Sequence, residues 1–334
     1  MSARIEMIEL FAGCGGLAAG AELENVRGQG LEWDVNAVAT RRAAGLATIH
    51  VDVRKHGPRD FPNTTILAGG PPCQTFTIAG DGSGRGELCK VVEAVKRMGA
   101  GETVDPTVFA DERTALILEP LRWALADFEC SYNAIVLEQV PQALPVWNAY
   151  AEVLRAQGYS VATGVLRTEQ YGLPQTRKRA VLVARRNGEA VLPEPTHRAY
   201  RKGVPQHEGD PRLKPWVSLG EALPDRGPFT VVSNYGTGGD PKNRGRRTSD
   251  EPAFTVTGKI SRLRLVDPDG RELPRLSHAE AGILQGFPAD WPWSGCDISQ
   301  QIGNACPVPL AAALIRAATA NPAMAGQDPE PWAA

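Results

Sequence analysis

The chain opens with an apolar segment that runs directly into a glycine cluster and then into a helical pattern. Residues 5–11 alternate apolar and polar side chains, which is typical of a strand. Glycines fill three of the four positions 13–16, and residues 17–23 have the apolar content of a helix. A strand joined to a helix by a glycine turn begins a βαβ unit, so this segment favours a parallel sheet with helices packed on it.

Strands and helices continue to alternate as far as residue 186. The strand-like segments are residues 26–33, 48–53, 64–68, 133–137, 161–166 and 180–184. The helix-like segments are residues 35–44, 88–98, 113–128 and 146–157. This alternation predicts an α/β fold built on an open, mostly parallel, Rossmann-like sheet.

Beyond residue 186 the pattern changes because proline interrupts it. Nine prolines lie between Pro193 and Pro252, which predicts a smaller, Pro-rich domain of loops and irregular strands. Helical patterns then return, the first of them after a capping-box sequence formed by Ser277 and Glu280. We therefore expect a first domain at 1–186, a small domain at 187–275, a connecting segment of the small domain at 276–302, and a C-terminal helix at 303–334 that returns to the first domain.

The composition excludes several classes of protein. No stretch of 18 or more consecutive apolar residues occurs in the 334, so no membrane-spanning helix is expected. The first residues lead directly into a strand, so no signal peptide is expected. The six cysteines form no C-x-x-C pair and the five histidines are scattered, which disfavours a disulfide framework and a metal site. A cytoplasmic protein without a bound metal is the resulting expectation.

The basic residues are concentrated in one part of the chain. Between Arg167 and Arg275 there are 21 Lys and Arg against 13 Asp and Glu, whereas the rest of the chain has 15 against 25. An unevenly charged, solvated surface would account for this, but residues 242–247 carry four cations on a glycine-containing loop. Such a loop is suited to approach a nucleic-acid backbone. The candidate DNA contacts in this region are Arg244, Arg246, Arg247, Lys259, Arg262 and Arg264.

The glycine turn after the first strand matches a dinucleotide fingerprint, Gly13-x-Gly15-x-x-Ala18. Its glycines allow backbone N–H groups to approach a ligand closely. Glu32 follows Gly13 by 19 residues, at the end of the second strand, where an acidic side chain binds ribose hydroxyls. The turn and Glu32 together indicate an adenosine-containing cofactor, and they leave NAD and S-adenosylmethionine both open.

A second motif places a cysteine at the carboxyl edge of the sheet. Cys73 follows a predicted strand through Gly-Gly-Pro-Pro. These flanking residues are unusual around a cysteine buried in a core, so an accessible thiol is favoured, and its thiolate would be a nucleophile. Glu138 ends another predicted strand and is a candidate acid. Arg177 and Arg179 are two residues apart, so on a strand both point to one face, with Lys178 on the other.

These motifs occur in a characteristic order along the chain. They are Phe11-Ala12-Gly13-x-Gly15-Gly16, Glu32-Trp33, Asp52, Gly70-Pro71-Pro72-Cys73-Gln74, Glu138-Gln139-Val140, Gln175-x-Arg177-x-Arg179, Leu284-Gln285-Gly286-Phe287-Pro288 and Gly303-Asn304. In this order they resemble the motifs of the C5-cytosine-specific DNA methyltransferases of prokaryotic or phage type. Only the segment between about 187 and 270 lies outside the resemblance.

The resemblance implies that residues 1–186 bind S-adenosylmethionine and that residues 187–275 recognise the target DNA. It implies a covalent adduct between Cys73 and a flipped cytosine, with Glu138, Arg177 and Arg179 completing the catalytic set. The implied cofactor-binding residues are Phe11, Ala12, Gly13, Gly15, Gly16, Leu17, Glu32, Trp33, Asp52, Val53, Gly70, Pro72, Asn304 and Ala305. Double-stranded DNA is the expected partner, and Gln74 and Gln175 join its candidate contacts.

Three alternatives remain. A transfer-RNA C5-cytosine methyltransferase would carry a Cys-Phe-Thr signature that is not found here, and a silent DNA-binding homologue is disfavoured by the intact Cys73 and Glu138. An NAD-dependent oxidoreductase rests only on the first turn and Glu32. Two departures from the family pattern are Gln139, in place of Asn, and a long segment at 80–112. A monomer is expected, and a cognate restriction enzyme encoded nearby is a candidate partner.

Overall fold

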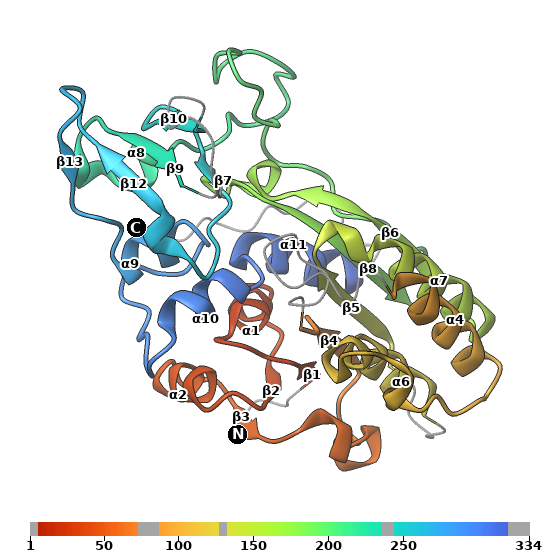
Figure 1. Ribbon diagram of the computed structural model, residues 1–334. Coiled ribbons are helices and arrows are strands. Elements are labelled where there is room, and N and C mark those ends of the chain that lie inside the picture. The colour runs from red at the N-terminus through yellow and green to blue at the C-terminus, as the bar shows by residue number, and fades with distance from the viewer. Residues whose placement is uncertain (1–5, 73–86, 127–131, 235–243, 320–334) are drawn as a thin grey trace.

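A computed structural model of the chain describes residues 6–72, 87–126, 132–234 and 244–319. Its main feature is a seven-stranded sheet, and a four-stranded sheet lies to one side of it (Figure 1). Both sheets have helices packed against them. Helices cover both faces of the larger sheet, which is the arrangement that the alternation of strands and helices predicts.

The seven-stranded sheet has the strand order β3-β2-β1-β4-β5-β8-β6. Its strands are β1 (Met7–Leu10), β2 (Gly28–Glu32), β3 (Thr48–His50), β4 (Ile66–Gly69), β5 (Ala134–Gln139), β6 (Ser160–Arg167) and β8 (Lys178–Arg185). The first five strands in this order pair in parallel, whereas β8 runs antiparallel to both β5 and β6. The prediction of an α/β fold with an open, mostly parallel sheet is therefore confirmed.

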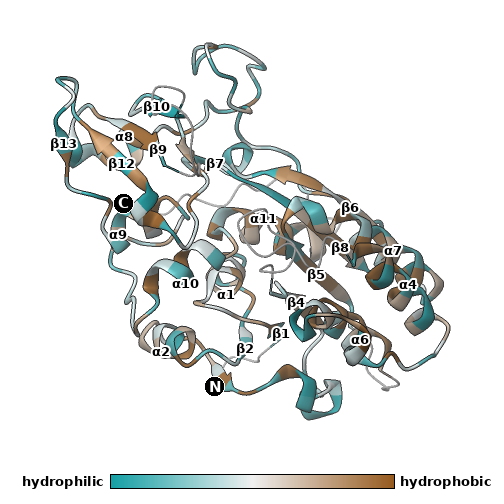
Figure 2. Ribbon diagram, in the orientation of Figure 1, coloured by the Kyte–Doolittle hydropathy of each residue, from teal (hydrophilic) through white to brown (hydrophobic). Residues whose placement is uncertain are grey.

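The two faces of this sheet are covered by different helices. Alternate strand residues divide between them: Ile8 and Leu10 pack into one apolar cluster, and Met7 into the other. On the first face lie α4 (Leu88–Gly99), α6 (Glu119–Leu125) and α7 (Leu144–Ala156), and on the second lie α1 (Gly16–Leu23) and α11 (Val308–Thr319). Figure 2 shows the apolar residues gathered on the strands and on the inner sides of these helices. The α2 helix (Val35–Ala43) packs beside β2 and β3.

Two predicted elements differ from those in the structure. The helix expected at 113–128 is divided into α5 (Glu112–Ala115), a 3₁₀ turn and α6, because Pro120 in the first turn of α6 has no N–H to continue the preceding helix. Residues 127 and 128 lie outside the described residues. The strand expected at 48–53 ends at His50, since the side chain of Asp52 caps a 3₁₀ turn over Val53–Lys55.

The smaller sheet is more regular than the sequence predicts. Its four antiparallel strands are β10 (Arg246–Thr248), β9 (Thr230–Ser233), β12 (Leu263–Val266) and β13 (Glu272–Leu273), in that order. The short helices near it are α8 (Leu219–Ala222), α9 (His278–Ile283) and α10 (Ile298–Asn304). Strand β11 (Ala253–Phe254) pairs in parallel with β7 (Gln175–Thr176) as a separate two-stranded sheet, which connects the segment before β8 with the segment between β10 and β12. The predicted capping box is present, because Ser277 and Glu280 bond each other's backbone N–H groups at the start of α9.

Among the described residues, one stretch is long and apolar enough to cross a membrane, namely Ile298–Thr319. It comprises α10 and α11, and 72% of its apolar window is buried inside the fold. Leu310 and Leu314 of α11 are fully buried against the second face of the large sheet. This stretch therefore packs as part of the protein core.

Candidate active site

A cavity of about 440 Å³ opens at the carboxyl ends of β1, β2, β4 and β5. In an open α/β sheet this edge is where ligands bind. Thirteen of the fourteen predicted cofactor residues line it, and the exception is Gly15. Gly15 has φ +107°, and a Cβ there would meet Leu46 at 2.4 Å. Gly15 thus provides the tight packing that starts α1.

The loop between β1 and α1 is shaped to leave space for a ligand. Phe11 and Gly13 both adopt left-handed backbone angles, with φ of 57° and 52°. A Cβ on Gly13 would have no atom within 4 Å, so the backbone faces open cavity at this position. A non-glycine residue in the left-handed region is strained, and such strain is concentrated at ligand sites.

Glu32 is held in the cavity wall by backbone N–H groups. Gly13 donates to its Oε2 and Asp34 to its Oε1, each at 2.7 Å. Burial raises the pKa of Glu32, and these two hydrogen bonds oppose the shift. Each carboxylate oxygen keeps a second lone pair, and the exposed ring of Trp33 stands next to it, 67% accessible. A carboxylate beside an exposed aromatic face suits a ribose and its base.

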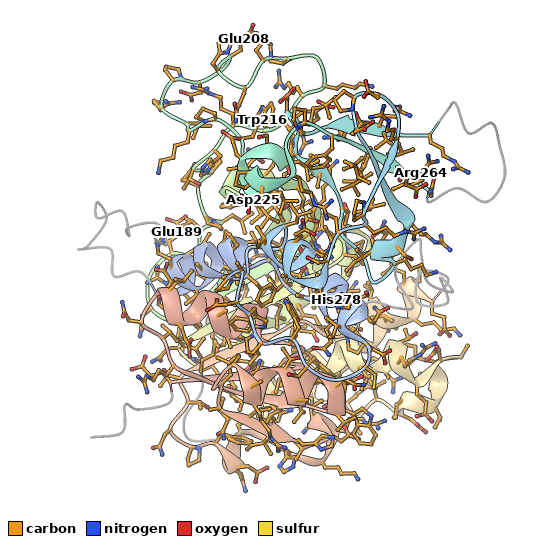
Figure 3. All side chains as sticks on the ribbon, turned by 90° about the vertical axis from the view of Figure 1, so that its left-hand side faces the viewer. Glu189, Glu208, Trp216, Asp225, Arg264 and His278 are labelled. Atoms are coloured by element: carbon orange, nitrogen blue, oxygen red, sulfur yellow. The ribbon has the colours of Figure 1, made fainter. Side chains whose placement is uncertain are left out.

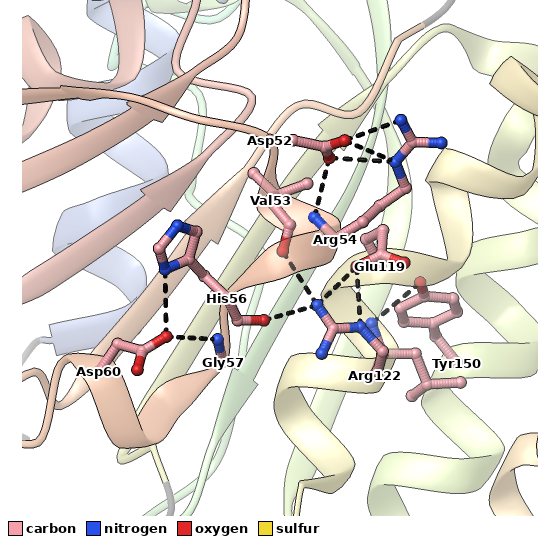
Figure 4. Close-up of polar contacts among 10 residues, drawn as sticks. Asp52, Val53, Arg54, His56, Gly57, Asp60, Glu119, Arg122 and Tyr150 are labelled. Carbon is pink, nitrogen blue, oxygen red and sulfur yellow. Dashed lines mark hydrogen bonds and ion pairs between the residues drawn. The ribbon is translucent and has the colours of Figure 1, made fainter.

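Asp52 and Val53 are each held by an arginine (Figure 4). Arg54 donates from its Nη2 to Asp52 Oδ2 at 2.7 Å, and this bond lowers the pKa of Asp52. Arg122 of α6 donates to the carbonyl oxygens of Val53 and His56 at 3.0 and 2.8 Å. The turn at Val53–Lys55, which lines this end of the cavity, is therefore tied to helix α6.

A buried ion pair lies below the glycine loop. Arg41 of α2 donates from Nη1 to Glu9 Oε2 and to the carbonyl oxygen of Ala12, both at 3.0 Å. The Arg41 side chain is fully buried, and Glu9 is 1% exposed. Burial raises the pKa of Glu9 to about 7, although Arg41 opposes the shift. The sequence analysis missed this pair, because a single Glu in an alternating strand looks like part of a solvated face.

At the other end of the cavity, Glu138 and Arg179 form an ion pair. Glu138 lies near the end of β5 and Arg179 near the start of β8, and both are at least nine-tenths buried. The neighbouring Gln139 donates from Nε2 to the carbonyl oxygen of Pro71 at 2.7 Å. Cys73 and Gln74, two of the predicted site residues, lie outside the described residues, as do the glycines at 80, 82, 84 and 86.

The other two residues of the Gln-x-Arg-x-Arg motif are bonded inside the protein. Gln175 is fully buried, and its Nε2 donates to the carbonyl oxygen of Leu284 at 2.6 Å. Its Oε1 accepts from the N–H of Val256 at 2.8 Å. This placement differs from the expected DNA contact, since the Gln175 amide joins segments of the fold. Arg177 is 1% exposed and donates to the carbonyl oxygens of Val256 and Gly303 at 2.7 and 2.8 Å.

A second cavity, of about 810 Å³, lies between the large sheet and the smaller one. We refer to it below as the cleft. It adjoins the first cavity, because Val140, Arg179, Gln300 and Asn304 line both. The cationic residues that line the cleft are Arg167, Arg177, Lys178, Arg179, Lys202, Arg247 and Lys259. Glu169 is the single acidic residue among the described residues that line it.

The predicted DNA contacts lie in different surroundings. Lys259 and Arg247 line the cleft, and Arg247 stacks on Tyr200 and Phe254, with its guanidinium carbon 4.2 and 5.0 Å from the ring centres. Arg264 on β12 pairs with Glu272 at 3.4 Å and lies on the small sheet, away from the cleft lining (Figure 3). The remaining three are Arg244, which donates to Asn234, exposed Arg246 on β10, and half-buried Arg262.

The sequence profile of the C-5 cytosine-specific DNA methylases matches residues 5–96, 107–218 and 225–320. The chain belongs to this family. The resemblance drawn from the motifs is thereby confirmed. The unmatched residues 97–106 begin in the last turn of helix α4, within the segment that the sequence marks as unusually long.

Named relatives of this methylase are bacterial type II methyltransferases. It is 28% identical to type II methyltransferase M.NlaX of Neisseria lactamica over 92% of this chain and 94% of that protein. It is 29% identical to M.NgoBI of Neisseria gonorrhoeae over 91% and 89% of the two chains.

Solved structures share the fold of the methylase. A DNA modification methyltransferase encoded within a prophage of E. coli has a TM-score of 0.60 at 16% identity, with 94% of this chain and 98% of that chain covered. The S. pombe Dnmt2 methyltransferase has a TM-score of 0.58 at 18% identity, covering 95% and 98%. In the parts of the methylase that the structure describes, no three His, Cys, Asp or Glu side chains are grouped to hold a metal ion.

Proposed function

We propose that this methylase transfers a methyl group from S-adenosylmethionine to C5 of a cytosine in a specific sequence of double-stranded DNA. The observation that carries the proposal is the position of the Glu138–Arg179 pair. Arg179 lines both the cofactor-type cavity and the cationic cleft, and Glu138 lines the first of them. A base that enters from the cleft would meet a carboxyl and a guanidinium group next to the methyl donor.

The residues of the first cavity fit S-adenosylmethionine. Glu32 has carboxylate lone pairs for the ribose hydroxyls, Trp33 and Phe11 offer aromatic faces, and Asp52 and Val53 lie at the far end for the adenine. A volume of about 440 Å³ is within the range of small-molecule sites. When bound, S-adenosylmethionine supplies a methyl group on a positively charged sulfur, which makes that methyl electrophilic.

The protein's own residues make carbon 5 of cytosine nucleophilic. Carbon 5 of cytosine is a poor nucleophile, and addition of the Cys73 thiolate to C6 makes C5 electron-rich. Glu138 donates a proton at N3 as negative charge moves into the ring. Arg179, held against Glu138, contacts O2 and stabilises the same charge. C5 would then take the methyl group as the bond between that methyl and the sulfonium sulfur breaks, which leaves a neutral thioether. The C5 proton passes to water, its electron pair restores the C5–C6 double bond, and the bond to sulfur breaks, so that Cys73 leaves as a thiolate and the N3 proton returns to Glu138.

The cytosine has to leave the duplex to reach these groups, at a cost of a few kcal/mol. We assign residues 1–186 to cofactor binding and catalysis and residues 187–275 to target recognition, with 276–302 connecting the small domain. The C-terminal helix from 303 onward returns to the first domain. The cationic cleft between the sheets receives the DNA, with Lys259 and Arg247 on the small-domain side.

The relatives also indicate a biological setting. Two of them are named type II methyltransferases, so we propose a role in restriction-modification, with a cognate restriction enzyme as companion. The enzyme acts as a cytoplasmic monomer in this proposal, because methylating one strand at a time requires no two-fold symmetry.

Methyl transfer to mixed-sequence DNA tests the proposal. The purified enzyme is incubated with labelled S-adenosylmethionine and long, unmethylated DNA, beside a Cys73→Ser variant, and the product is analysed by bisulfite sequencing. We expect 5-methylcytosine in one short recurring sequence context, and none with the variant. Transfer to transfer RNA and not to DNA would show that the RNA alternative is correct. Binding of S-adenosylhomocysteine with no transfer to either would indicate a silent homologue.

A further inference from the structure

Two cations face each other on the wall that the large sheet contributes to the cleft. Arg167 ends β6 and Lys178 begins β8, and they are direct partners in the antiparallel register. Both line the cleft. Like charges directly opposite each other destabilise a sheet, so an anion bound between the two side chains would reduce their repulsion. Neither residue is among the DNA contacts that the sequence predicts, although Lys178 lies within the Gln-x-Arg-x-Arg motif.

A buried carboxylate orients one of these cations. Glu169 lies two residues after Arg167, its side chain is fully buried, and its Oε1 accepts a 2.9 Å hydrogen bond from Arg167 Nε. Its Oε2 is buried and has no hydrogen-bond partner in the parts of the chain that the structure describes. A carboxylate buried without full satisfaction is costly. The cost is explained if Glu169 serves to hold Arg167.

The pairing leaves the outer face of the Arg167 guanidinium available. Only Nε is used by Glu169, and the two Nη nitrogens have no hydrogen bond to any residue of the described ranges. The Arg167 side chain is 38% exposed. Two parallel N–H donors on a guanidinium match the geometry of two phosphate oxygens.

Building on the proposed function, we propose that Arg167 and Lys178 bind one phosphate of the DNA backbone on the large-sheet side of the cleft, and that Glu169 positions Arg167 for that contact. Lys178 precedes Arg179, which lines both the cleft and the first cavity, where Glu138 lies. A phosphate bound here lies close to the place where the cleft meets the first cavity. The contact fixes the register of the duplex and carries no sequence information.

The salt dependence of DNA binding tests the proposal. Dissociation constants for an unmethylated duplex are measured by fluorescence anisotropy at several salt concentrations, in the presence of S-adenosylhomocysteine. Each phosphate contact contributes about 0.9 to the slope of log affinity against log salt. Because both cations bind the same phosphate, we expect Arg167→Gln and Lys178→Gln each to reduce the slope by up to about 0.9, and the double variant by no more than about 0.9. A fourfold rise in salt then weakens binding up to about threefold less than in the wild type.

Glu169 variants distinguish positioning from simple charge. We expect Glu169→Ala to reduce the salt slope by the same amount as Arg167→Gln. Combining these two substitutions should reduce the slope no further. Glu169→Gln should keep the wild-type slope, because the amide oxygen still accepts from Arg167 Nε. Tighter binding by Glu169→Ala at unchanged slope would overturn the positioning role. The control is Arg316→Gln, which breaks a bidentate ion pair with Glu24, with bonds of 3.0 and 2.8 Å, whose two residues line neither cavity.

The result separates this inference from the proposed function. A wild type that binds S-adenosylhomocysteine but no duplex would contradict the function itself. If the wild type has a steep salt slope and every Arg167 and Lys178 variant keeps that slope, the inference is overturned and the proposed function stands. Thermal stability with S-adenosylhomocysteine is measured for each variant, and the two cation variants suffice for the test if the Glu169 variants fail to fold.

Discussion

The side-chain amide of Gln139 donates a 2.7 Å hydrogen bond to the carbonyl oxygen of Pro71. Gln139 ends β5, and Pro71 follows β4 by two residues, so the bond joins the ends of adjacent parallel strands. The same side chain accepts from the N–H of Val140 through Oε1. In the sequence Gln139 is a departure from the family's usual Asn, and in the structure its longer side chain holds the segment that leads to Cys73.

Replacing Gln139 should therefore impair the chemical step more than cofactor binding. Gln139→Ala removes the bond to Pro71, and Gln139→Glu places a carboxylate against a carbonyl oxygen, which is repulsive. We expect kcat to fall by about 10-fold or more for alanine, since small misplacements near a nucleophile cost this much, and further for glutamate. The check is single-turnover methyl transfer beside calorimetric binding of S-adenosylhomocysteine. Equal losses in both measurements would indicate a general structural defect instead.

Glu138→Gln should abolish most of the activity while leaving DNA affinity nearly unchanged. The amide keeps the shape of the side chain but cannot give up a proton to the cytosine ring, and losing such a proton donor costs about 10²–10⁴ in rate. Kinetics at saturating DNA measure the effect. Glu24→Gln is the control, because it also removes a carboxylate from an ion pair, the one with Arg316 of α11 outside both cavities. A Glu138→Gln enzyme with wild-type kcat would show that the proton comes from elsewhere.

Folding stability should fall as the pH rises from about 4.5 to 7, and Glu9 should cause part of the decrease. Its pKa is raised from 4.5 to about 7 in the folded protein, so between these values the folded state binds more protons than the unfolded state. Raising the pH through this window thus favours unfolding, and the full cost is present above pH 7.

Urea unfolding of the wild type and Glu9→Gln at pH 5 and pH 7.5 measures this contribution. The variant cannot titrate at this position, so its free energy of unfolding should decrease less between the two pH values, by up to a few kcal/mol. Parallel pH profiles for the two proteins would show that Glu9 stays ionised beside Arg41 throughout. Lower stability of the variant at both pH values is expected as well, because Arg41 loses its partner.

The packing of α1 against α11 should not tolerate a methyl group at Gly20. A Cβ at Gly20 would lie 2.5 Å from the Ala311 side chain and 2.7 Å from the backbone nitrogen of Ala312. Since backbone cannot rotate away, Gly20→Ala should lower the free energy of unfolding by about 1–3 kcal/mol. Gly57→Ala is the matched control, because a Cβ there meets nothing within 4 Å. Equal stability of the two variants would contradict the described helix contact.

Short motifs in this chain predicted which residues meet at one end of the first cavity. The turn at 11–16, Glu32 and Asp52 lie at strand ends, and strand ends of a parallel sheet converge at one edge whatever the loop lengths. The sequence also predicted that Glu138 ends a strand and that Arg177 and Arg179 share one face of a strand, whereas the pairing of β5 with β8 comes from the structure. These positions depend on local patterns and on one topological rule, so sequence alone was sufficient for them.

The cleft required the structure because its residues meet through long-range pairing. Arg167 and Lys178 face each other only because β6 and β8 are antiparallel neighbours in a given register, which no local pattern reveals. Likewise the buried side chain of Gln175 bonds to Leu284 and Val256, about 80 to 110 residues away. A polar residue in a motif gives no indication of whether its partners are DNA or distant backbone.

The proposed mechanism requires Cys73 to form a covalent bond to C6 of a cytosine brought out of the duplex. DNA in which cytosine is replaced by 5-fluorocytosine tests it most directly, since fluorine cannot leave C5 as a proton does and the sulfur–carbon bond then persists. With S-adenosylmethionine present, mass spectrometry of the denatured mixture should detect enzyme joined to methylated DNA, with the link on the peptide containing Cys73. Enzyme that binds the duplex and S-adenosylhomocysteine, yet forms no such adduct and loses no activity on Cys73→Ser substitution, would contradict the account.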